Sequence, residues 1–496
     1  MIDSTLHTLQ PALIWKFFRL LSDIPRESKK EDRAVEWIVR TGRELGCDVE
    51  TQPLAGEERP YFANVLLRKA ATAGRELWPV IAMQAHIDMV CEKNQGTAHD
   101  FATDGIRLLI DGDHLRAEGT TLGADNGIGV CAALAALADP TLKHGPLEVL
   151  ITVDEEAGMT GARMLRPGWL RARHLLNLDS EDEGEATISC AGARDSTGRR
   201  GFSLVPSPIG ASSYALKVRG LRGGHSGLNI GENRGNAIKV LAGLLEGLEA
   251  VSPVRLADIA GGNKRNAIPR EATAVIWLES GAVSVASGIV LRGAESARAA
   301  FPEDSGLSIT LEPATAVSAL TAEDSAKLIS LLNALPHGVI AMSKDVLGLV
   351  ETSTNLAMVT IQDGAVGINL LSRSSIDPAK AALAGQINGI FSGYGFAGGE
   401  ANDYPGWKPQ PDSAVVHYLK RVHLDLTGKE LKITAFHAGL ECGLLGMAYP
   451  DMEMVSFGPN MWGVHTPQEH ASISSTGNFW KLLRSVLERA NELVQR

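Results

Sequence analysis

One apolar run sets the organisation of this chain: Pro79-Val80-Ile81-Ala82-Met83-Gln84-Ala85-His86-Ile87-Asp88-Met89-Val90. The run predicts a buried strand that ends in a histidine and an aspartate two positions apart. Residues two apart on an extended backbone point to the same side, so His86 and Asp88 share one face at the strand's end. A carboxylate placed there can hold the ring of a metal-binding histidine. Taken alone, the pair is more often a surface ion pair, and the rest of the chain decides between the two interpretations.

The length, charge and cysteine content of the chain narrow its class. With 496 residues it is too long for one compact core and predicts two or three domains. Its 58 acidic and 47 basic side chains give a net charge of −11, which argues against a general nucleic-acid binder. The five cysteines are scattered without Cys-x-x-Cys spacing, as in reduced cytoplasmic proteins. No secretory signal and no apolar stretch of membrane-spanning length are apparent, so we expect a cytoplasmic protein that binds neither nucleic acid nor membrane.

Strand and helix signals alternate around the opening run. Strands are predicted at 47–52, 64–68, 80–85, 147–153 and 174–178, and helices at 11–21 and 128–138. A further helix is predicted up to Gly46, opened by a capping box at Ser28-Lys29-Lys30-Glu31. Apolar strands that alternate with helices favour an α/β sheet covered on both faces.

After about Cys190 the pattern describes a second α/β region. Its predicted elements are strands at 213–218, 254–259, 272–278, 307–311, 355–362 and 367–374, and helices at 235–250 and 322–334. Ser392 to Pro411 is rich in glycine and proline and predicts a linker back to the first region. The last segment alternates again and ends in an amphipathic helix over 476–493. We therefore expect that residues 1–192 and 403–496 form one domain, into which residues 193–402 are inserted.

Four further stretches place ionisable side chains at strand ends or in loops. Asp125 lies in a small-residue loop before a helix, Asp154-Glu155-Glu156 follows a buried strand, Asp179 ends another strand, and His465 lies in a Gly/Pro loop. Each has an ordinary explanation, as a helix N-cap, a solvated turn or a loop histidine. Together with His86, however, they supply two histidines and three carboxylates, which two divalent ions need if one carboxylate bridges them. Oxygen and imidazole ligands without cysteine favour zinc, manganese or cobalt.

Two metal ions bound by these residues could catalyse hydrolysis. Two ions about 3.5–4 Å apart can activate a bridging water and stabilise a developing oxyanion. The carboxylate left over from the acidic triplet, Glu155 or Glu156, is then free to take the proton from that water. The residues therefore predict a dimetal hydrolase and leave the choice between these two glutamates open.

Seven motifs in the chain are similar to those of the M20 metallopeptidase family, in particular its bacterial dipeptidases. They run nearly end to end and in order: Gln84–Val90, Gly119–Gly129, Glu155–Met159, Leu178–Ser180, Gly223–Gly227, Arg265–Arg270 and His437–Gly443. The resemblance implies an α/β protein. It would have a dinuclear-metal catalytic domain, built as a mixed sheet flanked by helices, and an inserted α/β lid domain. It also implies a cis peptide bond after the bridging aspartate, here Asp125-Asn126.

The resemblance also assigns the metal ligands. His86 and Asp179 would hold one ion, Glu156 and His465 would hold the other, and Asp125 would bridge them. The implied cofactors are two divalent metal ions, zinc first, with manganese or cobalt as alternatives.

Three residues are implied in catalysis by the same resemblance. Asp88 would orient the imidazole of His86, and Glu155 would be the general base that activates the water. His225, on a Gly-rich turn of the lid, would help to stabilise the oxyanion. Relatives often have a threonine where this chain has Asp154, so we expect this extra carboxylate to point away along the strand pleat.

The implied activity is the hydrolysis of dipeptides with broad specificity, including Xaa-His. The free carboxylate of the substrate would be bound by Asn266, Arg373 and the backbone near Gly439. A guanidinium can grip a carboxylate through two parallel hydrogen bonds. A lid that recognises this carboxylate limits the length of the peptide, which makes a dipeptidase.

Other activities share the metal motifs. The alternatives within the family are a tripeptidase, a carboxypeptidase and an N-acyl amino-acid deacylase. A non-catalytic peptide-binding scaffold is a rival from another class, against which the presence of Glu155 and all five ligands argues. A phosphate-binding role for Gly220–Gly227 is weaker, because the turn lacks the required lysine. The resemblance also leaves open whether the chain forms a homodimer or completes its site within one chain.

Overall fold

The computed structural model describes residues 6–54, 56, 58–207, 209–362 and 364–493, which fold into two compact units. Unit 1 consists of Met1–Ser189, Pro409–Ala435 and Leu440–Arg496. Unit 2 consists of Cys190–Lys408 and Phe436–Gly439. The C-terminal part of the chain therefore belongs to the same unit as the N-terminal part.

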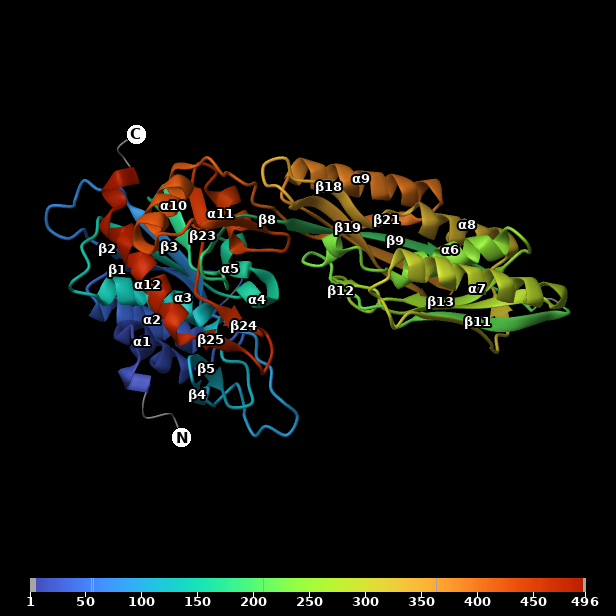
Figure 1. The fold of residues 1–496 in the computed structure, drawn as a ribbon, viewed down its shortest axis with the longest axis horizontal. Helices are drawn as coiled ribbons and strands as arrows, with labels where there is room; N and C mark the ends of the chain where they lie inside the picture. The colour runs from blue at the N-terminus through green and yellow to red at the C-terminus, as the bar shows by residue number, and fades with distance from the viewer. Residues whose placement is uncertain (1–5, 55, 57, 208, 363, 494–496) are drawn as a thin grey trace. The chain divides into compact units, whose positions relative to one another are not determined.

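An eight-stranded mixed sheet forms the centre of unit 1 (Figure 1). Its strands are, in spatial order, β1 (Asp48–Pro53), β2 (Ala63–Lys69), β6 (Leu147–Thr152), β3 (Ile81–His86), β7 (His174–Asn177), β23 (Glu453–Ser456), β8 (Glu185–Cys190) and β22 (Lys432–Phe436). β3 pairs in parallel with both β6 and β7. Every residue of β3 and β6 is buried, as expected for strands with helices on both faces of the sheet.

Helices cover this sheet. They are α1 (Ala12–Ser22), α2 (Asp32–Glu44), α3 (Ala124–Ala138), α4 (Glu155–Gly158), α5 (Thr160–Arg163), α10 (Ala414–Thr427), α11 (Glu441–Ala448) and α12 (Ile473–Glu488). α3 packs between β3 and α1, and its small apolar residues are buried all round, which is typical of a helix inside a core. A smaller sheet consists of β24 (Met461–Trp462), β25 (His470–Ser472), β5 (His114–Ala117) and β4 (Leu108–Asp111). No helix in the described part of the chain combines the length and the apolar composition of a membrane span.

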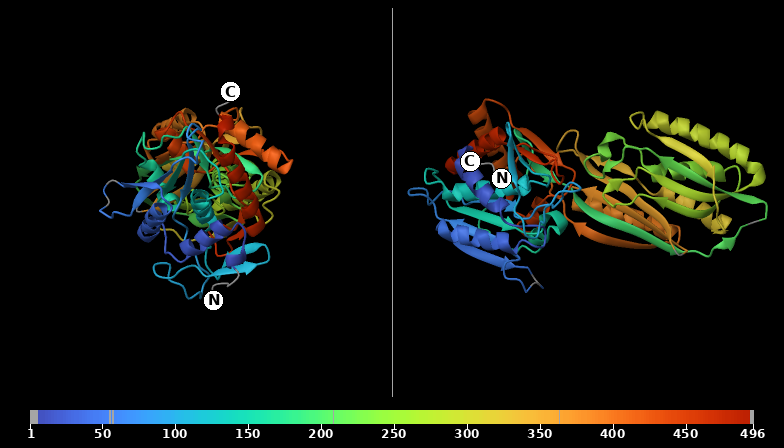
Figure 2. Two further views of the ribbon diagram at one scale, coloured as in Figure 1. Left: turned by 90° about the vertical axis from the view of Figure 1, so that its left-hand side faces the viewer. Right: turned by 90° about the horizontal axis from the view of Figure 1, so that it is seen from below.

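Unit 2 is built on a nine-stranded antiparallel sheet. The strands are β16 (Ser308–Pro313), β11 (Ala211–Arg219), β15 (Ala272–Glu279), β13 (Arg255–Gly261), β19 (Val350–Gln362), β20 (Ala365–Ser374), β9 (Gly192–Gly201) and β21 (Ala397–Tyr404), with β18 (Gly338–Met342) also paired to β19. Four helices pack along the sheet (Figure 2): α6 (Ala237–Glu249), α7 (Val283–Ala300), α8 (Ala322–Ala334) and α9 (Asp377–Gly393). The sheet and these helices share one apolar core.

The short elements complete the path of the chain. They are the strands β10 (Val205–Pro206), β12 (Gly224–His225), β14 (Ala267–Ile268) and β17 (Ser318–Ala319), and the 3-10 helices Leu6–Thr8, Ile230–Glu232, Ser280–Ala282 and Ala490–Leu493. β12 pairs with β14 and carries His225 at its end.

Three local predictions differ from the structure. The capping box is wrong: α2 begins at Asp32, and the Ser28 hydroxyl donates to the buried carboxylate of Asp88 (2.8 Å) instead of capping the helix. The segment 392–411 is not only a linker, because it contains β21, which pairs with β9. The last α-helix ends at Glu488 and is followed by a 3-10 turn. In the first case the fold brings a charged acceptor, Asp88, to the Ser28 hydroxyl, and in the second case a sheet edge orders a Gly-rich strand.

We predict that Phe391→Ala lowers the free energy of unfolding of unit 2 by about 3–5 kcal/mol. Phe391 on α9 is 0% exposed and lies directly over Gly198 of β9, so the truncation leaves a cavity that the sheet cannot fill. Urea denaturation followed by tryptophan fluorescence measures the effect.

The matched control is Leu291→Ala on α7, where the side chain is 67% exposed. It should change the free energy of unfolding by less than about 0.5 kcal/mol. Equal effects of the two substitutions would contradict the assignment of the core.

Candidate functional site

Five ionisable side chains of unit 1 meet where strands end and helices begin. His86 is the last residue of β3, and Asp179 lies two residues beyond β7. Asp125 stands in the first turn of α3, Glu156 in α4 after β6, and His465 in the loop between β24 and β25. Because β3, β6 and β7 run in parallel, their carboxyl ends fall at the same edge of the sheet.

These side chains contact one another through Asp125. His86 Nε2 lies 3.1 Å from Asp125 Oδ1 and 3.3 Å from Asp179 Oδ1. His465 Nε2 lies 3.2 Å from Asp125 Oδ2 and 3.0 Å from Glu156 Oε1. The structure therefore brings together all five side chains predicted as ligands, and Asp125 offers one oxygen to each histidine.

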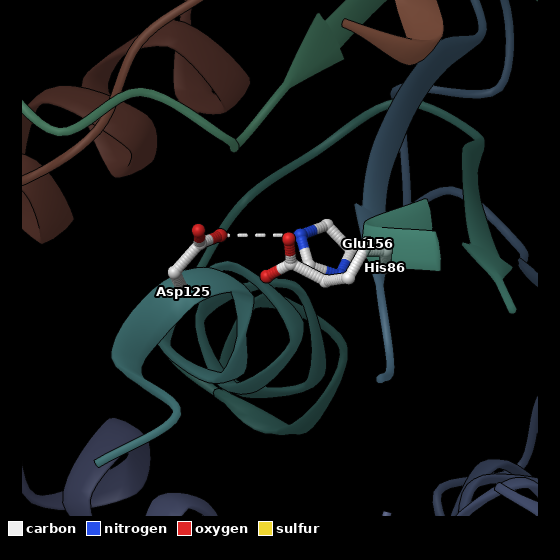
Figure 3. A group of neighbouring side chains, drawn as sticks. All are labelled: His86, Asp125 and Glu156. Carbon is white, nitrogen blue, oxygen red and sulfur yellow. Dashed lines mark hydrogen bonds and ion pairs between the residues drawn. The ribbon is translucent and has the colours of Figure 1, made fainter. Parts of the chain in front are cut away.

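One subset is compact enough to hold a metal ion. Ligand atoms of His86, Asp125 and Glu156 all lie within 4.8 Å of one another. Figure 3 shows these three side chains, from β3, α3 and α4, pointing toward one another. One imidazole and two carboxylates form a donor set that suits zinc or manganese.

The five candidate ligands and Glu155 include several buried carboxylates, which a positive charge would stabilise. Burial raises the pKa of Glu155 well above its usual range and also raises the pKa of Glu156 and Asp179. Hydrogen bonds to Asp125 and Glu156 raise the pKa of His465 to about 11. Buried carboxylates so close together repel one another unless a cation lies between them. A divalent ion bound by these atoms would supply that charge.

Asp88 ties the ring of His86 to the start of α4. The Asp88 carboxylate is 0% exposed, and its Oδ1 lies 3.3 Å from His86 Nδ1. The same carboxylate accepts hydrogen bonds from the backbone N–H of Glu155 (3.0 Å) and of Glu156 (3.1 Å). The contact between His86 and Asp88 is the one that their spacing predicted. The hydrogen bonds to α4 were not predicted, because they join residues 67 and 68 positions apart.

The backbone is unusual at several of these positions. The peptide bond between Asp125 and Asn126 is cis, as the resemblance implied. His465 adopts a φ of 62°, in the left-handed region that few non-glycine residues occupy. Left-handed φ values at non-glycine residues gather where function constrains the backbone.

The carboxylate of Asp154 points away from the candidate metal ligands, as expected, but the strand pleat is not the reason. β6 ends at Thr152, so Asp154 is not part of the strand pleat and instead has a left-handed φ of 56°. Its carboxylate accepts a hydrogen bond from the Thr160 hydroxyl, and its backbone N–H donates to Glu31. The extra carboxylate is therefore occupied by Thr160.

In unit 2, three of the residues predicted to bind substrate or stabilise the oxyanion lie around one turn. Arg373, near the end of β20, lies 3.4 Å from the Nε2 atom of His225 through its Nη2. Its Nη1 donates to the Tyr404 hydroxyl (3.2 Å) and its Nε to the Ser226 hydroxyl (3.4 Å). Asn266 joins this group through its backbone carbonyl, which accepts a hydrogen bond from the N–H of Ser226 (2.8 Å). The side chain of Asn266 is exposed.

Arg373 is a buried cation. It is 4% exposed, and within the described part of the chain no Asp or Glu side chain lies in ion-pair distance of it. Burial and the charge of Arg373 lower the pKa of His225 to about 4, so this neighbour is a neutral imidazole. A guanidinium surrounded by neutral groups is ready to bind an anion. Gly439 belongs to the same unit, but no hydrogen bond between it and Arg373, His225 or Asn266 is present among the described residues.

Sequence reasoning missed several polar residues in these groups. Ser28 was interpreted as a helix cap, although it binds Asp88. Arg26 and Glu469 are buried beside the metal-ligand candidates, and Tyr404 binds Arg373. None carries a local pattern, because their partners lie far away in the sequence.

Comparison with known proteins agrees with this geometry. The model of peptidase family M20/M25/M40 matches residues 82–489. The chain is 42% identical to the cytosol non-specific dipeptidase of Escherichia coli (strain K12) over 487 residues, 98% of this chain and 99% of the relative.

Solved structures of two peptidases are also similar to this chain. The structure of aminoacylhistidine dipeptidase from Vibrio alginolyticus matches with a TM-score of 0.90 and 39% identity, over 98% of each chain. A tripeptidase from Staphylococcus aureus shares the fold, with a TM-score of 0.56 and 15% identity over 98% of this chain and 99% of that chain. The chain therefore belongs to peptidase family M20/M25/M40, whose members are hydrolases of α/β fold.

Proposed function

We propose that this protein is a metal-dependent dipeptidase of broad specificity, whose substrates include Xaa-His dipeptides. The observation that carries the proposal is the convergence of two histidines and three carboxylates, in which each oxygen of Asp125 contacts one histidine, with Glu155 left beside them. The names of two similar proteins, both dipeptidases, support the choice of substrate.

The proposed metal centre uses the five residues in two sets. His86 and Asp179 hold one divalent ion, Glu156 and His465 hold the other, and Asp125 bridges them, in keeping with the pairs of contacts around the two Asp125 oxygens. When bound, the ions would lower the pKa of a shared water and polarise the scissile carbonyl. Zinc fits this donor set first, with manganese or cobalt as alternatives.

Glu155 is the proposed general base. It takes a proton from the attacking water and later returns it to the leaving amine. Its backbone is fixed by the hydrogen bond to the Asp88 carboxylate (3.0 Å), so the residue that orients His86 also positions the base. Asp154 does not compete for this role, because Thr160 binds its carboxylate.

We predict that Glu155→Gln lowers the rate of dipeptide hydrolysis by at least about 10²-fold while metal content is unchanged, because the amide cannot accept the proton. Steady-state kinetics and metal analysis of the purified variant measure both quantities. The control is Glu118→Gln, which removes an exposed carboxylate of unit 1 (56% exposed) and should leave the rate unchanged. Full activity of the Glu155 variant would exclude it as the base.

Unit 2 supplies the proposed anchor for the substrate. Arg373, together with Asn266 and the backbone near Gly439, binds the free carboxylate of the dipeptide, and His225 stabilises the oxyanion. The support is the buried guanidinium of Arg373, which lacks an anion among the described residues, and the neutral imidazole beside it. In this proposal unit 2 is the lid domain inserted into the catalytic domain, close to the predicted boundaries 193–402.

We predict that Arg373→Ala raises KM for dipeptides by at least about 10-fold, because a charge-assisted contact of 1.5–3 kcal/mol is lost. Arg373→Lys should recover only part of the affinity, since an ammonium group cannot bind both carboxylate oxygens in parallel. The control Arg219→Ala removes an exposed arginine of unit 2 and should leave KM unchanged. An unchanged KM in both Arg373 variants would remove this residue from the substrate site.

A fixed anchor for the carboxylate also separates this proposal from related activities. A tripeptide cleaved at its first peptide bond would place its carboxylate one residue further from the scissile bond. An N-acyl amino acid keeps the spacing of a dipeptide but lacks the free amine. We expect dipeptides to be cleaved at least about 10-fold faster than either, in a panel assayed with zinc, manganese and cobalt. Faster cleavage of tripeptides would favour a tripeptidase, and no cleavage of any substrate would favour a binding scaffold.

The remaining assignments are proposals of smaller scope. The relative named as a cytosol dipeptidase supports a cytoplasmic location. The homodimer stays a prediction, which size-exclusion chromatography with light scattering can test.

A further inference from the structure

Two buried charges outside the proposed ligand set hold the turn that precedes Asp125. Arg26 is 1% exposed and Glu469 is 3% exposed. They act on the same residue, Gly123: Arg26 donates to its carbonyl oxygen, and Glu469 accepts a hydrogen bond from its N–H. All of these residues belong to unit 1.

Glu469 accepts hydrogen bonds from four consecutive backbone N–H groups. One carboxylate oxygen binds the N–H of Leu122 (2.7 Å) and of Gly123 (3.0 Å). The other oxygen binds the N–H of Ala124 (2.7 Å) and, at 3.4 Å, that of Asp125 itself. Glu469 follows His465 by four residues, so it joins the loop of one candidate ligand to the turn of another.

Arg26 connects the same turn to the end of β3. Its Nη2 donates to the carbonyl of Gly123 (2.6 Å). Its Nη1 lies within hydrogen-bond distance of the carbonyls of Ile87 (3.1 Å) and Asp88 (3.3 Å), which directly follow His86. One guanidinium thus spans the segment that carries His86 and the segment that carries Asp125.

The glycine between the two charges is required by this arrangement. Gly123 has a φ of 69°, and a Cβ atom added to it would lie 2.4 Å from Arg26 Nη2 and 2.7 Å from the sulfur of Met89. A Cβ on Gly127 would lie 2.9 Å from the same Nη2 atom. The backbone therefore approaches the guanidinium as closely as only glycine permits.

We propose that Arg26 and Glu469 are positioning residues that set the two oxygens of Asp125 at the distances from His86 and His465 that metal binding requires. The inference rests on the proposed metal centre. Because charged partners fix the backbone from both sides, Asp125 cannot relax away from the other carboxylates when they repel it. Groups that orient metal ligands in this way typically change metal affinity 10–100-fold when they are removed.

A purely structural role is the alternative, and the chain offers a matched control for it. Glu148 on β6 is also buried (1% exposed) and accepts hydrogen bonds from the backbone N–H of Arg171 (2.8 Å) and Ala172 (3.0 Å). It also pairs with an arginine, Arg68 (3.0 Å). Glu148 lies near the start of β6, whereas the candidate ligands lie beyond its end. Loss of either glutamate should lower the melting temperature, but only Glu469 should affect the metal.

The test is the affinity of the metal-free protein for Zn²⁺, measured by competition with a chromophoric chelator. We expect Glu469→Gln to raise the dissociation constant about 10–100-fold, because an amide offers one acceptor oxygen where the carboxylate offers two. We expect Glu148→Gln to leave the dissociation constant within about twofold of the wild type. At saturating Zn²⁺, dipeptide hydrolysis by Glu469→Gln should recover most of the wild-type kcat, since the variant keeps every ligand and the base.

A second variant keeps the test decisive if Glu469→Gln does not fold. Arg26→Lys keeps the positive charge, but a single ammonium group cannot reach the three carbonyls, so we expect the same weakening of Zn²⁺ affinity. The variants of Arg26 and Glu469 that fold could instead have a lowered melting temperature, as in Glu148→Gln, and an unchanged Zn²⁺ affinity. That result would overturn the inference and leave the proposed function intact. Absence of Zn²⁺ binding by the wild type would instead refute the proposed metal centre.

Discussion

Repulsion among buried carboxylates is the constraint on which the rest of unit 1 depends. Asp88, Asp125, Glu155, Glu156 and Asp179 meet at the ends of three parallel strands, where burial raises the pKa of Glu155, Glu156 and Asp179. Such a cluster persists only if the surrounding backbone cannot yield and if cations neutralise it. The buried strands β3 and β6 and the apolar helix α3 supply the rigid frame. Two divalent ions bound by these carboxylates and the two histidines would supply the positive charge.

The frame is completed by hydrogen bonds to the backbone rather than by further ion pairs. Asp88 holds the start of α4 through two N–H groups, and Glu469 holds the turn before Asp125 through four. Backbone donors cannot move away as a lysine side chain can, so each carboxylate fixes the segment that it binds. Asp88 and Glu469 therefore fix the backbone next to the candidate metal ligands, although neither is a candidate ligand. In unit 2, by contrast, the buried Arg373 lacks a carboxylate partner among the described residues, and its contacts are to neutral groups.

Much of this organisation could be predicted from the sequence, because local pattern carries it. A continuous apolar run identified β3, and the period of two placed His86 and Asp88 on one face, as the 3.3 Å contact between them shows. Local pattern alone favours a helix N-cap for Asp125 and a solvated turn for Asp154-Glu155-Glu156. The family resemblance selected the other interpretation and the cis peptide bond. Contacts between distant segments could not be predicted, since Glu469 and Leu122 are 347 positions apart. Ser28 shows the same limit: its spacing fits a capping box, but a charged acceptor brought near by the fold binds it instead.

The central claim is that Asp125 bridges two divalent ions in unit 1. Native mass spectrometry of the metal-free chain titrated with Zn²⁺ tests it most directly, because each bound ion adds a distinct mass. The account predicts that the wild type takes up two ions per chain and that dipeptide hydrolysis appears as they bind. A chain that hydrolyses dipeptides with no bound metal, or that binds no more than one ion at saturation, would contradict it.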